Sequence, residues 1–115
     1  MTVHRLKTYA SSQGYVYLYY FTGQKKAAGN GTEYLFDVTI DRTQTYTVSV
    51  SLPCGAVEFW ASSHGRELSD SEQYAAVKLR LFRAFDEIPN MPHDGRALSV
   101  DADFLEESLA SLGVD

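Results

Sequence analysis

Two neighbouring stretches of the chain, residues 33–41 and 44–52, alternate almost strictly between apolar and polar side chains. Successive side chains of a strand point to opposite faces of a sheet, so a period of two predicts two strands that share one buried face. Leu35 is the exception, because it is apolar on the polar side. The apolar positions are Tyr34, Phe36, Val38, Ile40, Tyr46, Val48, Val50 and Leu52.

The same alternation predicts how these two strands pair. Directly opposed residues on neighbouring strands point to the same face, so even positions must lie opposite even positions. We expect Val38 opposite Val48, with both facing the helices, which requires a connection of three or five residues. A two-residue loop would instead pair Ile40 with Thr45 and mix the two faces.

Two further strands are predicted upstream of this pair. Residues 15–22 are rich in aromatic and β-branched side chains, which favour strands. Residues 3–9 alternate more weakly and suit either a strand or a loose arm. The intervening residues 23–32 contain several glycines and two adjacent lysines, and are predicted to form a loop.

Beyond residue 52 the apolar spacing becomes helical, and helices are predicted at 53–64, 69–88 and 101–112. Trp60, Phe82 and Phe85 fall on the apolar stripes and should be buried. Strands followed by helices are typical of an α+β fold. We therefore predict one domain over residues 1–115, an antiparallel meander of three to four strands with two to three helices packed on one face.

Charge is distributed unevenly along the chain. Residues 1–32 contain four Lys/Arg and no acid, whereas residues 33–115 contain six Lys/Arg and all fifteen acids. This asymmetry in charge is compatible with a basic surface that binds an anionic partner, or with head-to-tail self-association. A third interpretation is that it has no functional meaning. The acidic pairs at 86–87 and 106–107 are interpreted as solvent-exposed helix surface.

The strand at 15–22 is apolar on both sides. Its odd positions carry the aromatic row Tyr15, Tyr17, Tyr19 and Phe21, and its even positions carry Val16, Leu18 and Tyr20. Only one side can meet the helices, so the other faces water, a ligand or another protein, unless residues 1–10 cover it. Since soluble monomers tend to avoid large exposed apolar patches, we expect the aromatic row to form the interface of a homodimer.

Lys78 lies in the middle of the apolar stripe of the longest predicted helix, between Tyr74 and Phe82 on a helical wheel. A bare ammonium group is costly in such a place. Its stem can lie along the core with the tip at an edge, or a carboxylate such as Asp37 or Asp86 can meet it. Alternatively, Lys78 and Tyr74 line a pocket for a small ligand between the sheet and the helices.

Catalytic, metal-binding and nucleic-acid-binding patterns are weak. Cys54 lies near a helix start, but His64 is about 15 Å further along that helix, too far to act as its base. The three histidines lack the spacing of metal ligands, and no phosphate-binding loop is present. An aromatic sheet beside lysines resembles some RNA-binding surfaces, yet the net charge of -5 opposes phosphate binding.

The sequence thus favours a non-catalytic protein-interaction or assembly module without a cofactor. The alternatives are a small-ligand-binding protein or enzyme with a pocket at Lys78, and nucleic-acid binding by the basic first third. No apolar run approaches the ~18 residues needed to cross a bilayer. Neither a signal peptide nor a disulfide pair is evident, since Cys54 is the only cysteine, so we expect a cytoplasmic protein without a membrane partner.

Overall fold

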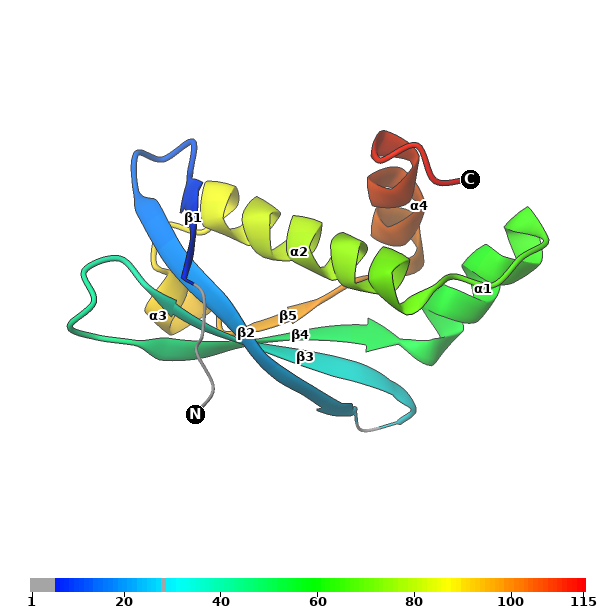
Figure 1. The fold of residues 1–115 in the computed structure, drawn as a ribbon, viewed down its shortest axis with the longest axis horizontal. Coiled ribbons are helices and arrows are strands. Elements are labelled where there is room, and N and C mark those ends of the chain that lie inside the picture. The colour runs from blue at the N-terminus through cyan, green and yellow to red at the C-terminus, as the bar shows by residue number, and fades with distance from the viewer. Residues whose placement is uncertain (1–5, 28) are drawn as a thin grey trace.

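The computed structural model describes residues 6–27 and 29–115, which form a five-stranded sheet and four helices (Figure 1). The predicted α+β class is confirmed, with β5 and the short α3 as unexpected additions. Of the strand predicted at 3–9, residues 3–5 lie outside the described residues. The strands are β1 (Lys7–Ala10), β2 (Val16–Lys26), β3 (Gly31–Thr39), β4 (Tyr46–Pro53) and β5 (Ala97–Ser99). The helices are α1 (Cys54–His64), α2 (Asp70–Glu87), α3 (Met91–Asp94) and α4 (Ala102–Ser111).

The sheet is mixed, which corrects the prediction of a wholly antiparallel meander. Its strands lie in the order β1-β2-β3-β4-β5, and only the last pair, β4 and β5, is parallel. The chain leaves β4 through three helices before it returns at β5, and parallel neighbours require such a long crossover. β5 contains a single buried side chain, Leu98, so no period in the sequence marks it as a strand.

The pairing of β3 with β4 differs from the predicted register by two residues. Phe36, rather than Val38, lies opposite Val48, and Val38 lies opposite Tyr46. A slip of two residues keeps every side chain on its own face. The predicted buried face is therefore confirmed within the two strands, although the predicted partners are wrong. Ile40 is the exception, because it lies beyond the end of β3 and is 51% exposed.

The connection between β3 and β4 accounts for this slip. Thr39 Oγ1 accepts a hydrogen bond from the backbone N–H of Arg42 at 3.0 Å. Asp41 Oδ1 accepts one from the backbone N–H of Thr43 at 2.9 Å. These local bonds stabilise a connection that spans residues 40–45, longer than the three or five residues expected.

Local signals in the sequence fix the ends of the helices. Ser69 Oγ accepts from the backbone N–H of Glu72, while the Glu72 carboxylate accepts from the backbone N–H of Ser69, which is a complete capping box. Asp101 caps α4 by accepting from the backbone N–H of Phe104 at 2.7 Å. Gly65 ends α1 with a φ of 71°, a conformation that glycine adopts without strain.

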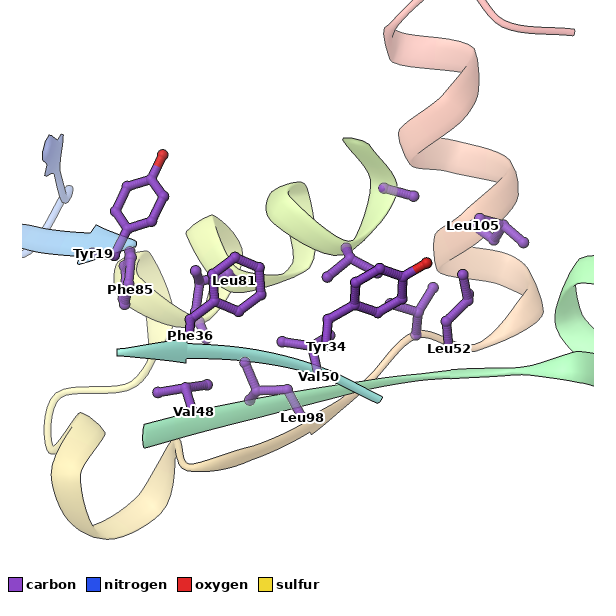
Figure 2. Packing of buried hydrophobic residues seen from close by; sticks show 14 of the residues in the cluster. Tyr19, Tyr34, Phe36, Val48, Val50, Leu52, Leu81, Phe85, Leu98 and Leu105 are labelled. Atoms are coloured by element: carbon purple, nitrogen blue, oxygen red, sulfur yellow. The ribbon is translucent and has the colours of Figure 1, made fainter. Parts of the chain in front are cut away.

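Helices α1, α2 and α4 lie on one side of the sheet, and the core lies between these two layers (Figure 1). Figure 2 shows side chains of β2, β3 and β4 meeting those of α2 and α4. Trp60 and Phe85 are buried, as predicted. Phe82 is only half-buried, because it lies at the flank of α2, where its ring stacks on Tyr9 of β1.

Candidate functional site

The aromatic row of β2 lies partly in the core. Tyr17 and Tyr19 are only 3% and 4% exposed, and the ring of Tyr17 stacks on Phe85 with 4.1 Å between the ring centres. The expectation that the whole row forms an outward interface is therefore wrong for these two side chains. At the ends of the row, Tyr15 is exposed and Phe21 is half-buried.

The β1–β2 hairpin reaches the C-terminal end of α2, which explains this burial (Figure 1). Asp86 accepts hydrogen bonds from the Tyr9 hydroxyl at 2.7 Å and from the backbone N–H of Ser12 at 2.9 Å. The ring of Tyr9 also stacks on Phe82. Asp86 therefore anchors the hairpin to α2, and the two interpretations from sequence, exposed helix surface and partner of Lys78, are both wrong.

The hydrogen bond between Tyr9 and Asp86 predicts that the free energy of unfolding falls at alkaline pH. The hydrogen bond to Asp86 raises the pKa of Tyr9 from 10.0 to about 12, with smaller contributions from burial and from the carboxylate charge. Because the folded-state pKa is the higher one, the bond contributes fully below pH 10 and its contribution is lost as pH rises toward 12. Tyr9→Phe should lower the free energy of unfolding by about 1 kcal/mol at neutral pH.

The measurement is urea unfolding of the unmodified protein and of Tyr9→Phe from neutral pH upward. The difference between their free energies of unfolding is expected to narrow above pH 10. Tyr15→Phe is the matched control, since no carboxylate among the described residues accepts a bond from its hydroxyl. If the difference in free energy of unfolding between Tyr9→Phe and the unmodified protein stayed constant with pH, the proposed role of the Tyr9–Asp86 hydrogen bond would be contradicted.

The opposite face of the sheet is not covered by α1, α2 or α4 (Figure 1). On this face, Val16, Leu18 and Tyr20 of β2 and Leu35 of β3 form a group that we call the outer-face patch. Tyr20 lies opposite Asp37, which is two positions from Leu35, so the members from the two strands are diagonal neighbours. Val16 is 52% exposed and the other three are half-buried.

The carboxylates of this outer face are paired within the chain. Asp37 accepts a hydrogen bond from the Tyr20 hydroxyl at 2.9 Å, which raises the pKa of Tyr20. Glu33 accepts from Ser49 of β4 and lies 3.7 Å from Lys25 of β2. These contacts connect three neighbouring strands, so the outer face is a preorganised surface.

Lys78 is half-buried on the flank of α2, and its Nζ lies 5.5 Å from the centre of the Tyr74 ring. Asp37 lies on the far face of the sheet and Asp86 binds Tyr9, so the two carboxylates proposed from sequence do not meet it. Burial lowers the pKa of Lys78, and the charge of the nearby Lys7 lowers it further. The recesses at residues 58–67, at the β3–β4 connection and beside α4 are lined by other residues, and a ligand pocket at Lys78 and Tyr74 stays a prediction.

A recess that the sequence did not predict lies where the β1–β2 turn, the β3–β4 connection and the α2–α3 connection meet. Its volume is about 210 Å³. The Tyr46 hydroxyl is buried without a hydrogen-bond partner among the described residues, and burial raises its pKa. Separate segments build the walls, so no local pattern could reveal them. They are Tyr15, Tyr17, Ile40, Tyr46, Pro89, Asn90 and Pro92.

The cysteine and histidine of α1 make structural contacts. Cys54 Sγ donates to a carboxylate oxygen of Glu58 at 3.3 Å, and this bond raises the pKa of the thiol, which disfavours the nucleophilic thiolate. His64 lies 2.8 Å from a carboxylate oxygen of Glu106 on α4. Within residues 6–27 and 29–115, no three His, Cys, Asp or Glu side chains are grouped as metal ligands.

Comparison of the chain with protein-family models, with curated proteins and with solved structures finds no match. Among the described helices, none combines the length and the apolar character needed to span a bilayer. The candidate functional sites therefore rest on the geometry of this chain alone, without support from a related protein.

Proposed function

We propose that this chain is a non-catalytic protein-interaction module that self-associates through the outer face of its sheet. The supporting observation is the outer-face patch. The inner side of β2 already supplies Tyr17 and Tyr19 to the core, while Val16 and Leu18 occupy the side that the three helices leave uncovered. Contact with a second copy removes this apolar surface from water, and two-fold dimers are the commonest arrangement.

The charges on the same face support a second copy as the partner. Lys25 of β2 and the carboxylates of Glu33 and Asp37 of β3 all lie on the outer face. These groups already form contacts within one chain, and a two-fold contact with β2 of one copy across β3 of the other would add attraction between opposite charges at the rim of the patch. Attraction between exposed charges is screened by salt, so association should weaken at high ionic strength.

Leu18→Glu is expected to convert the protein into a folded monomer. The new carboxylate would stand within the patch and would lose its hydration when two faces meet, at a cost that its partner side chains cannot offset. Light scattering at micromolar concentration should give twice the chain mass of 12.8 kDa for the unmodified protein and the chain mass itself for the variant. Circular dichroism checks that the variant remains folded.

Phe59→Glu is the matched control, because Phe59 is 65% exposed on α1, away from the sheet. This variant should remain dimeric. An unmodified protein that is monomeric at micromolar concentration contradicts the proposal, as does a dimer that dissociates with Phe59→Glu instead of Leu18→Glu. Charged replacements at Tyr17 or Tyr19 do not test association, because both side chains belong to the core.

A further inference from the structure

Strand β2 extends well beyond its neighbour β1. β1 pairs only with residues 16–19, whereas β2 continues to Lys26. From Phe21 to Lys26, β2 has β3 on one side and, in the part of the chain that the structure describes, no strand on the other. This edge is about 20 Å long and presents backbone N–H and C=O groups that a further strand can pair with.

Lysines lie at both ends of this edge, on the side of the sheet that faces the helices. Lys7 is opposite Tyr19, whose side chain is buried beneath α2, and opposed residues share a face. Lys26 is two positions beyond Gln24, which lies opposite the buried Tyr34. The two lysines therefore flank the strip between the edge of β2 and α2.

A third ammonium group, that of Lys78, reaches the same strip from α2. Its Nζ lies over the ring of Tyr74, and that ring is 5.1 Å from the ring of Phe21, at the start of the edge. Among the described residues Lys78 forms no ion pair, and residues 1–5 contain no acid that could supply one. The nearby charge of Lys7 has the same sign, so an anion bound beside the two groups would relieve their repulsion.

We propose that the edge from Phe21 to Lys26 binds an extended acidic segment of a partner protein by strand addition. The backbone of the segment pairs with the edge, and alternate side chains of the segment point toward α2. A carboxylate at one of these positions meets Lys78 and Lys7, and one further along meets Lys26. This surface is distinct from the outer-face patch, so the inference does not depend on self-association.

The geometry favours a peptide over a nucleic acid. A strand edge is recognised through backbone N–H and C=O groups at the spacing of a second strand, which a sugar–phosphate chain lacks. The net charge of -5 also opposes a polyanion that runs over the whole surface. Lysines on an edge strand discourage pairing with uncharged strands, so they select for an acidic segment.

The test uses fluorescence anisotropy with a labelled octapeptide of alternating valine and glutamate, and a second octapeptide with glutamine in place of glutamate. We expect the glutamate peptide to bind at least about tenfold more tightly, since hydrogen bonds to charged groups are the stronger ones. Lys78→Met, which keeps the length of the side chain, should weaken that binding about tenfold. Lys25→Met is the matched control and should change it less than about twofold, because Lys25 points to the outer face and lies beside Glu33.

Amide hydrogen exchange locates the bound peptide. The glutamate peptide should slow exchange of amides between Phe21 and Lys26 and leave the central strand β4 unchanged. The proposal is overturned if neither peptide binds, if both bind equally, or if Lys78→Met has no effect. It is also overturned if a single-stranded oligonucleotide or inorganic phosphate binds in a Lys78-dependent manner while the glutamate peptide does not.

Discussion

Phe85→Ala is expected to lower the free energy of unfolding by about 3–5 kcal/mol, the usual cost of truncating a buried phenylalanine. The Phe85 side chain is 0% exposed, and its ring stacks on Tyr17. It also contacts the rings of Tyr9 and Tyr19, so one side chain of α2 supports both strands of the β1–β2 hairpin. Its loss leaves a cavity at the junction where the hairpin meets the helix.

Phe59→Ala provides the matched control, because it makes the same truncation at a position that is 65% exposed. That variant should change the free energy of unfolding by less than about 0.5 kcal/mol. Urea unfolding monitored by circular dichroism compares the two. If Phe85→Ala were no more destabilising than Phe59→Ala, the packing of the hairpin against α2 would be wrong.

The features that could be predicted from sequence are those encoded by short-range patterns. The capping box at Ser69 and Glu72 and the cap at Asp101 are local hydrogen bonds, and they begin α2 and α4 close to the predicted starts at 69 and 101. Period-two alternation identified the buried face of β3 and β4 correctly. It could not choose between registers that differ by two residues, because both keep the faces intact and the choice depends on the turn around Thr39 and Asp41.

The features that sequence could not predict depend on contacts between distant segments. The bond from Tyr9 to Asp86 joins residues 77 positions apart, and nothing near either residue signals it. Strand β2 is apolar on both sides, so its pattern alone could not show which side the helices cover. The large rings of Tyr17 and Tyr19 fill the space beside Phe85, and this packing decides the side.

The surroundings of Lys78 show the same contrast between what a local pattern predicts and what contacts between distant segments decide. The helical wheel placed Lys78 in the middle of the apolar stripe, whereas the structure has it half-buried on the flank of α2 with its Nζ over the Tyr74 ring. The carboxylate partners suggested for it were wrong, because the sheet separates Asp37 from α2 and the hairpin engages Asp86. The edge of β2 beside Lys78 became visible only from the strand pairing, in which the described part of β1 meets β2 from Val16 to Tyr19.

Gly31→Ala is expected to lower the free energy of unfolding by about 2–4 kcal/mol, from backbone strain and a steric clash together. Gly31 begins β3 with a φ of 139°, which side-chain-bearing residues rarely adopt. A Cβ at this position would lie 2.7 Å from the carbonyl oxygen of Leu52 and 3.1 Å from the backbone nitrogen of Cys54. Both contacts are with backbone at the junction of β4 and α1, which cannot move aside as a flexible side chain can.

Gly55→Ala isolates this effect, because it makes the same substitution on α1, where an added Cβ meets no atom within 4 Å. Alanine favours helix over glycine, so this variant should be unchanged or stabilised by up to about 1 kcal/mol. Since 1 kcal/mol corresponds to roughly 4 °C in a domain of this size, thermal unfolding should separate the two variants clearly. Equal melting temperatures for them would show that β3 does not approach the β4–α1 junction as closely as described, and the register of the β3–β4 pair would then need revision.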